Sequence, residues 1–263
     1  MKIALLMSGG IDSLCMEHIG KLKYPKAEFV KVYYNIGHEN RMQEMRCLAA
    51  DTKVRKVDWY KDGEEAHNLK EVGPWFIPAR NAVFALLAAA QELPDEVWYG
   101  VLYYEFIGAS TSNDKDPKFI KTMNALLAHT LAPYMDKPPE LKTPLVDLQM
   151  TKAEMMQYCL ENGMKESQIT NTHSCYRNSD QPCGNCHACL RNWCNLYQMN
   201  RTDLLNFKTH PVHSEHGKHE IEALMKQDPE TMDTACKYEV LPALSKYMTT
   251  ASFAIDRFKA IDQ

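Results

Sequence analysis

The sequence contains no run of about 18 apolar residues, which is the length that a membrane-spanning helix needs. Its longest apolar stretch, from Ala79 to Ala90, is interrupted by Arg80 and Asn81. The apolar segment Met1–Met7 is too short for the core of a signal peptide and leads directly into a Ser-Gly-Gly turn. These absences predict a cytoplasmic protein with no membrane partner.

Charge of one sign is also not in large excess. The 263 residues include 30 lysines and arginines and 34 aspartates and glutamates, which gives a formal net charge of −4. So small an imbalance gives no reason to expect an extended nucleic-acid-binding surface. Hydrophobic residues make up 45% of the chain, which supports a packed core and argues against intrinsic disorder.

Along the first half of the chain, short segments typical of strands alternate with longer segments of helical periodicity. The predicted strands are Ile3–Met7, Phe29–Asn35, Val54–Trp59 and Glu96–Leu102. The predicted helices are the segment after the first strand up to about Leu22, and Arg41–Ala50, Ala79–Leu93 and Asp116–Pro133. This order predicts βαβ units and therefore a doubly wound, Rossmann-like parallel sheet with helices on both faces.

The second half of the chain changes character twice. Thr151 and Glu154 predict a capping box at the start of a further helix. The segment from Asn171 to Arg191 is polar and Cys-rich, as a metal-bound loop would be. After Leu205 the composition shifts to His, Lys and Glu and then to amphipathic helical stretches. We therefore predict one domain over 1–204, including a zinc-binding segment over 174–191, and a helical C-terminal extension over 205–263.

A glycine turn separates the first predicted strand from the first predicted helix, and it reads Ser8-Gly9-Gly10-Ile11-Asp12-Ser13. The glycines let the backbone turn sharply and bring N–H groups close to an anion, and the helix N-terminus adds its positive end. Two hydroxyls can donate to phosphate oxygens, whereas Asp12 would hold Mg²⁺ or orient the loop. The alternative interpretation is an ordinary strand-to-helix turn. The absence of Gly-Lys-Ser/Thr excludes the motif of γ-phosphoryl transfer.

This hexapeptide is similar to the PP-loop of the ATP pyrophosphatase superfamily. The resemblance implies that ATP is cleaved between its α- and β-phosphates while the loop holds the pyrophosphate. It also implies that AMP is transferred to an oxygen of the substrate. AMP is then a good leaving group when a nucleophile attacks later.

Nine cysteines are present, and four of them lie between Cys175 and Cys189. Cys183, Cys186 and Cys189 form two consecutive C-x-x-C steps, to which Cys175 adds a fourth thiolate. Four thiolates at short spacings suit tetrahedral Zn²⁺ and leave no coordination position open for catalysis. An iron–sulfur cluster and a redox-active pair remain as alternatives. Clustering without a secretory signal argues against a disulfide framework.

The two motifs, in this order, resemble those of the 7-cyano-7-deazaguanine synthase (QueC-like) family. Three further blocks carry the resemblance: Ile77-Pro78-Ala79-Arg80-Asn81; Thr143-Pro144-Leu145 with Thr151-Lys152-Ala153-Glu154; and Ser174-Cys175-Tyr176 with Pro182-Cys183-Gly184. Together they extend over residues 1–193.

The resemblance implies that ATP adenylates the carboxylate of 7-carboxy-7-deazaguanine, that ammonia forms the amide, and that a second activation forms the nitrile. It implies that Ser8, Gly9, Gly10, Asp12 and Ser13 bind the ATP phosphates with Mg²⁺, and that the four cysteines hold zinc. Asp12, Arg80 and Lys152 would be catalytic, the two cations neutralising charge during adenylation. A purely structural role is the alternative for Arg80. Lys152 lies at a helix start, where the dipole disfavours a cation, and this favours a functional role.

The match weakens where the substrate would bind. Gly37-His38-Glu39-Asn40 stands in place of Gly-Gln-Arg-His, and Asp116 stands where the family has an arginine. Asp114 is retained and could pair with the N–H groups of a deazapurine, or it could cap the following helix.

These departures leave three functional interpretations. The first is the nitrile-forming synthase, with ammonia as the acceptor. The second is a relative, of the kind linked to antiviral defence, that stops at an amide and joins the deazaguanine to a protein or another amine. The third is a zinc-containing module that binds nucleotide or RNA without turnover. The expected partners are ATP, a deazapurine carboxylate and ammonia or a protein amine, and a homodimer is left open.

Four histidines recur at every third position, at His210, His213, His216 and His219. Surface metal binding is one interpretation of this spacing. Pro211 and Gly217 argue against a regular helix there, so the segment is predicted to be a polar loop.

Overall fold

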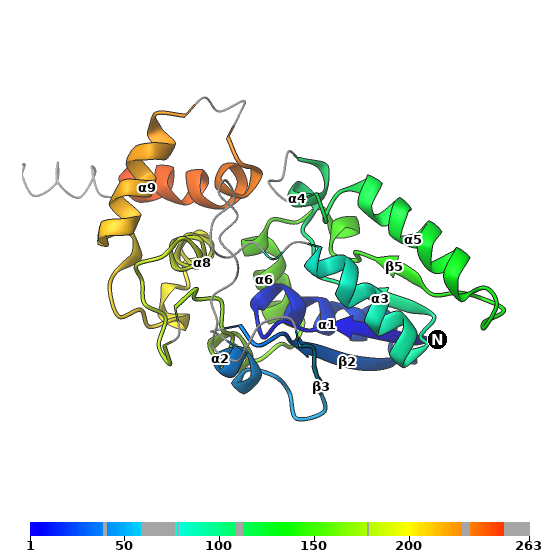
Figure 1. Ribbon diagram of the computed structural model, residues 1–263. Coiled ribbons are helices and arrows are strands. Elements are labelled where there is room, and N and C mark those ends of the chain that lie inside the picture. Colours follow the sequence, from blue (N-terminus) through cyan, green and yellow to red (C-terminus); the bar gives the residue numbers. More distant parts are fainter. Residues whose placement is uncertain are drawn as a thin grey trace, which may run out of the picture.

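The computed structural model describes residues 1–38, 41–58, 77, 79–108, 113–177, 179–227 and 232–249. Within these residues, five parallel strands form one sheet in the order β3-β2-β1-β4-β5 (Figure 1). The strands are β1 (Lys2–Leu6), β2 (Glu28–Asn35), β3 (Lys53–Lys56), β4 (Glu96–Trp98) and β5 (Glu140–Lys142). From β1 the successive strands β2 and β3 are added on one side, whereas β4 and β5 are added on the other side. The position between β1 and β4 is therefore the switch point of the sheet, where ligands bind in doubly wound folds.

Helices cover both faces of this sheet. The α-helices are α1 (Ile11–Lys23), α2 (Arg41–Arg46), α3 (Arg80–Glu92), α4 (Tyr103–Ile107), α5 (Pro117–Leu131), α6 (Lys152–Glu161), α7 (Glu166–Thr170), α8 (His187–Gln198) and α9 (Glu215–Met225). Short 3-10 turns are η1 (Val146–Leu148), η2 (Thr202–Leu204) and η3 (Pro211–His213), and a π-helical turn η4 (Cys236–Val240) continues as α-helix over 241–249.

The central strand β1 explains the layering. Ile3 and Leu5 point to the face covered by α1 and α6, whereas Ala4 and Leu6 point to the face covered by α3 and α5. All four are buried. A strand buried on both faces is typical of a parallel sheet, so the predicted doubly wound fold is confirmed.

Several element bounds differ from the prediction. The fourth strand was expected to reach Leu102, but only Glu96–Trp98 pairs with its neighbours. Beyond β4 the chain passes close to α1. A Cβ added at Gly100 would lie 3.4 Å from backbone and side-chain atoms of Asp12. The predicted helix from residue 41 ends at Arg46 instead of residue 50. The third predicted strand ends at Lys56, and its last expected residue lies outside the described residues.

Two local predictions hold. Thr151 caps α6 through the bond from the backbone N–H of Glu154 to its Oγ1, and Glu154 bonds back to the backbone N–H of Thr151. The helix predicted from residue 116 forms as α5, with Asp116 as its N-cap at 2.6 Å from the Phe119 nitrogen.

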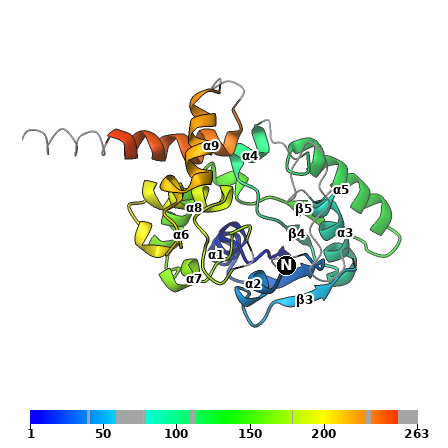
Figure 2. The ribbon, with the colours of Figure 1, turned by 60° about the vertical axis from the view of Figure 1, so that its left-hand side comes forward.

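Of the residues after 205, those described at 206–227 and 232–249 pack against α8 (Figures 1 and 2). Trp193 and Cys194 of α8 share an apolar cluster with Leu224 of α9 and Val240 of η4. Cys194 is fully buried in this cluster. The domain boundary near residue 205 stays a prediction. No helix of the described part of the chain is long and apolar enough to cross a membrane.

Candidate active site

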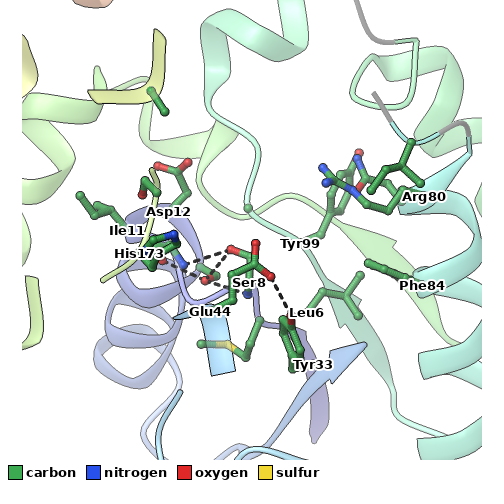
Figure 3. Close-up of a pocket in the computed structure, with 18 of the residues that line it drawn as sticks. Leu6, Ser8, Ile11, Asp12, Tyr33, Glu44, Arg80, Phe84, Tyr99 and His173 are labelled. Carbon is green, nitrogen blue, oxygen red and sulfur yellow. Dashed lines mark hydrogen bonds between the residues drawn. The ribbon is translucent and has the colours of Figure 1, made fainter. Parts of the chain in front are cut away.

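A cavity of about 470 Å³ opens where β1, β2 and β4 end. The predicted site residues that line it are Ser8, Gly10, Asp12, Ser13, Arg80, Lys152 and Cys175. Figure 3 shows Asp12 and His173 on one side of this cavity and Arg80, Phe84 and Tyr99 on the other, with Ser8 and Glu44 between them. The switch point of the sheet therefore brings the glycine turn at residues 8–13 together with Lys152 and Cys175, which lie far along the sequence.

The turn between β1 and α1 is held closed by its own hydrogen bonds. The Ser8 backbone N–H donates to Ser13 Oγ at 3.2 Å, and Ser13 Oγ donates to the Gly10 carbonyl at 3.0 Å. Gly9 has a φ of +72°, and a Cβ there would lie 2.7 Å from the Glu44 carbonyl oxygen. Only glycine fits this position, and the turn leaves α1 with its N-terminus at the cavity.

Lys152 reaches this turn from the first residue of α6. Its Nζ lies 3.1 Å from Oδ1 and 3.2 Å from Oδ2 of Asp12. The residue is only 8% exposed. Burial lowers the pKa of Lys152, but the carboxylates of Asp12 and Glu239 outweigh burial, so the pKa lies above its ordinary value. Lys152 is therefore a permanent buried cation beside the glycine turn.

Arg80 lies across the cavity from this pair, at the start of α3. It is exposed, and the residue before it, Ala79, has a left-handed φ of +57°. Non-glycine residues rarely adopt that conformation, which is strained and is often found at functional sites. The turn at Ala79 sets the direction in which α3 starts and hence the position of Arg80.

The helix-cap interpretation of Asp114 is wrong. The N-cap of α5 is Asp116, and this explains an aspartate at the position where the related family has an arginine. The carbonyl of Asp114 accepts a hydrogen bond from the Tyr99 hydroxyl at 3.1 Å, and Tyr99 lines the cavity. Among the described residues, Asp114 itself is not part of the lining. A role in substrate binding stays a prediction.

Sequence reasoning missed a buried carboxylate in the C-terminal segment. Glu239 is fully buried and bonds the guanidinium of Arg191, which lines the cavity. It also accepts bonds from the Tyr104 hydroxyl at 2.6 Å and the Asn195 amide at 2.7 Å. Burial alone would raise the pKa of Glu239, but Arg191 and Lys152 lower it to about 2. Arg191 follows the cysteine block and could have been noticed, whereas Glu239 carries no sequence signal.

A second missed group lies at the end of β2. The Tyr33 hydroxyl donates to Glu44 Oε2 at 2.7 Å, and His38 Nε2 lies 3.1 Å from the same oxygen. All three residues line the cavity. His38 belongs to the tetrapeptide that departs from the related family, so one departure falls on the cavity wall. The last two residues of that tetrapeptide, at 39 and 40, lie outside the described residues.

The four predicted cysteine ligands come together as one group. Their Sγ atoms all lie within 4.8 Å of one another, and those of Cys183 and Cys189 are 3.9 Å apart. Four ligands at about 2.3 Å from a tetrahedral zinc ion would lie about 3.8 Å apart. The Cys175 sulfur also accepts backbone N–H bonds from Arg177 and Cys183. The donor set and its spacing fit a bound metal ion.

Tight backbone contacts hold the cysteine loop. Gly184 has a φ of +69°, and a Cβ there would lie 1.6 Å from the Thr209 carbonyl oxygen. The segment contributes His173, Ser174 and Tyr176 to the cavity wall, and the His173 backbone N–H donates to the Gly9 carbonyl at 2.9 Å. The cysteine group therefore fixes a segment that touches the glycine turn.

The family model and the sequence relatives agree on one family. The family model described as "Queuosine biosynthesis protein QueC" matches residues 59–198. A 7-cyano-7-deazaguanine synthase from Saccharophagus degradans is 30% identical over 213 residues, which cover 72% of this chain and 89% of that synthase. One from a Nitratiruptor species is 26% identical over 211 residues, which cover 72% of this chain and 90% of that synthase.

One solved structure is distantly similar. It is the U34-tRNA thiolase NcsA from Methanococcus maripaludis with its [4Fe-4S] cluster, at 17% identity and a TM-score of 0.39. The match covers 90% of this chain and 75% of that one. A similarity this weak carries no argument about the present site.

Proposed function

This chain belongs to the QueC family of queuosine biosynthesis proteins, and from this premise we propose that it is an ATP-dependent ligase that forms a carbon–nitrogen bond. Its substrate would be the carboxylate of 7-carboxy-7-deazaguanine, and its simplest acceptor is ammonia, giving 7-cyano-7-deazaguanine. The observation that carries the proposal is the meeting of Asp12 and Lys152 at the glycine turn, in a cavity that also contains Arg80.

The glycine turn would hold the phosphates of ATP. The N-terminus of α1 and the hydroxyl of Ser8 supply donors for phosphate oxygens. The Ser13 hydroxyl, which donates to the Gly10 carbonyl in this structure, would turn toward the phosphates when ATP binds. Asp12 would hold Mg²⁺ against the phosphates, and the ion would supply charge neutralisation for the leaving pyrophosphate. Lys152 adds a second positive charge from a buried, fixed position, where electrostatic stabilisation is strongest.

The rest of the cavity would take the substrate. The rings of Phe84 and Tyr99 lie on the side of Arg80 and suit a planar deazapurine. The guanidinium of Arg80 can pair with a carboxylate or a phosphate oxygen. Cavities of about 300–1,000 Å³ accommodate ligands of this size.

The reaction would proceed by adenylation of the carboxylate, which releases pyrophosphate, and then by attack of ammonia, which releases AMP. A carboxylate oxygen attacks the α-phosphorus, and the bond to pyrophosphate breaks. Ammonia then attacks the acyl carbon, loses a proton, and AMP departs with the former carboxylate oxygen. For the nitrile, the amide oxygen is adenylated by a second ATP and leaves with its AMP as the amide nitrogen loses its two protons. Lys152 and Arg80 would stabilise the negative charge that develops in each step.

The four cysteines would hold a structural zinc ion in this proposal. Their close sulfur spacing supports a single ion. An iron–sulfur cubane takes each thiolate on a separate outer corner and therefore separates the four sulfurs more widely. A zinc ion here would keep His173, Ser174 and Arg191 in the cavity wall.

A second candidate is a ligase that stops at an amide with a protein amine or another amine as acceptor. It is favoured by His38, which departs from the related family and contacts Glu44 in the cavity wall. A change at this wall would alter the acceptor without affecting the glycine turn.

The experiment is an incubation of the purified protein with ATP, Mg²⁺ and 7-carboxy-7-deazaguanine, once with ammonium and once with candidate protein amines as the acceptor. AMP, pyrophosphate and products are measured by chromatography and mass spectrometry. The expected products are AMP, pyrophosphate and the nitrile. AMP with an amide or an amine conjugate would favour the second candidate. Absence of AMP under all these conditions would instead favour the module that binds without turnover and would refute the ligase proposal.

A further inference from the structure

Three side chains that can bind metal lie together outside the cavity. His187 is the first residue of α8 and follows the ligand Cys186, whereas His216 and Glu220 lie one turn apart on α9. One donor atom from each of the three lies within 4.8 Å of the other two. None of these residues lines the cavity described above, among the residues that the structure describes.

The contacts within this group converge on Glu220. One carboxylate oxygen is hydrogen-bonded to His187 Nδ1, and the other lies 2.9 Å from His216 Nε2. Both atoms of the second pair are screened from solvent, yet their geometry does not make a hydrogen bond, so neither has a hydrogen-bond partner among the described residues. Buried polar atoms without partners are rare and call for an explanation such as an ion.

The fold brings this group together through α9. Ser214 caps the helix by accepting the Gly217 N–H at 2.9 Å, and Gly217 lies so close to Pro211 that a Cβ would be 1.9 Å from its carbonyl oxygen. The spacing of four residues then places His216 and Glu220 on one face. The predicted polar loop is therefore wrong from residue 215 onward, because the Ser214 cap and the absence of a Cβ at Gly217 allow α9 to start there. Residues 210–214 form only a 3-10 turn and the cap, in agreement with the predicted lack of a regular helix there.

A further contact ties α9 to the cysteine loop. The His216 backbone N–H donates to Asn185 Oδ1 at 2.9 Å, and Asn185 lies between Cys183 and Cys186. The start of α9 is thus held beside the start of α8, which is the position where His187 projects toward Glu220.

We propose that His187, His216 and Glu220 form a second metal site, distinct from the four-cysteine group, that binds a divalent transition ion of the zinc type and fastens α9 to α8. Two imidazoles and one carboxylate are a ligand set that zinc accepts, with distances of about 2.0–2.2 Å. Tetrahedral ligands at those distances lie about 3.3 Å apart, so the 2.9 Å pair needs only a small side-chain movement. Three ligands leave one position for water.

The test is a count of bound zinc in the full-length protein by inductively coupled plasma mass spectrometry after equilibration with Zn²⁺ and gel filtration. We expect about two ions per chain for the wild type and about one for His216→Ala and for Glu220→Gln, because each removes a ligand from a three-ligand site. His219→Ala is the matched control, since His219 is exposed on the same helix and outside the group. It should keep about two ions.

Cobalt substitution separates the two sites in the same variants. Thiolate-to-cobalt charge-transfer bands report the cysteine group, and they should persist in Glu220→Gln while the weaker d–d absorption of a nitrogen- and oxygen-ligated ion disappears. Glu220→Gln keeps the shape of the side chain, so loss of the second ion without unfolding supports the site. A wild type with one ion, or a Glu220→Gln protein with two, would mean that the three residues form only an ion-pair network and would overturn the proposal.

Discussion

The ammonium nitrogen of Lys152 lies 3.1 Å from Oδ1 of Asp12, so the first turn of α1 is paired with the first residue of α6 across 140 positions of sequence. This salt bridge is mostly buried on the lysine side. It places a fixed positive charge and a carboxylate beside the donors of the glycine turn, as a site for a phosphate chain and its metal ion requires.

The first prediction concerns this cation. Lys152→Ala should lower the rate of AMP formation by about 10²–10³-fold, because it removes a preorganised charge from a site of low dielectric constant. The measurement is release of AMP and pyrophosphate at saturating ATP. Lys118→Ala, on the exposed start of α5, is the control and should keep the wild-type rate. Equal rates in the two variants would remove Lys152 from the catalytic machinery.

The second prediction compares two glycines with positive φ. Gly9→Ala should abolish AMP formation, because its Cβ would lie 2.7 Å from the Glu44 carbonyl oxygen. Gly163 has a φ of +93°, and a Cβ added there would meet no atom within 4 Å, so Gly163→Ala carries only the backbone penalty of about 1–2 kcal/mol. It should remain active while its unfolding midpoint in urea falls. An active Gly9→Ala enzyme would contradict this prediction, because it would show that the turn can move away from the Glu44 carbonyl without loss of function.

The third prediction concerns the buried carboxylate Glu239. Glu239→Ala should lower the free energy of unfolding by about 3–5 kcal/mol, because it leaves Arg191 as a buried charge without its partner. Chemical denaturation at pH 7 measures this, with Glu222→Ala on α9 as an exposed control.

The same carboxylate predicts a dependence on pH. The pKa of Glu239 falls from an ordinary 4.5 to about 2 in the folded protein. A depressed folded pKa contributes stability above the unfolded value, and this contribution is lost as pH falls through the folded value. The difference in unfolding free energy between wild type and Glu239→Gln should therefore shrink from pH 4.5 toward pH 2. A difference that stays constant over that interval would contradict the assignment.

The fourth prediction concerns the four-cysteine group. Cys183→Ser should lose the metal ion that gives cobalt–thiolate bands and should unfold at a lower temperature, because metal affinity adds to folding free energy. Cys47, which lies outside the group and is half-buried, provides the control Cys47→Ser. That variant should keep both the bands and the melting temperature.

The fifth prediction distinguishes a cap from a substrate contact. Asp116→Ala should lower stability by about 1 kcal/mol through loss of the α5 cap, with Asp116→Asn losing less. Thermal unfolding measures the first effect, and the KM for 7-carboxy-7-deazaguanine should not change. A large rise in KM with unchanged stability would show that Asp116 contacts the substrate.

The local motifs of this protein could be predicted from the sequence because each is formed by residues that lie only a few positions apart in the chain. The buried strand, the glycine turn and the helix after it follow one another within residues 2–23. The capping box of Thr151 and Glu154 and the grouping of four cysteines likewise depend on spacings of a few residues. The strand β5 has three residues, too few for an alternating pattern to appear, and it was not predicted.

The sequence by itself therefore determined the alternation of the first four strands with the helices between them, the glycine turn and the thiolate set, since propensity, capping and metal spacing act over short stretches of chain. The tertiary structure alone decided that Lys152 meets Asp12, that Glu239 pairs with Arg191, and that Glu220 reaches His187. Those pairs are separated by 140, 48 and 33 positions. Their meeting depends on which helix packs on which face of the sheet, and burial of whole apolar faces, not any local pattern, sets that arrangement.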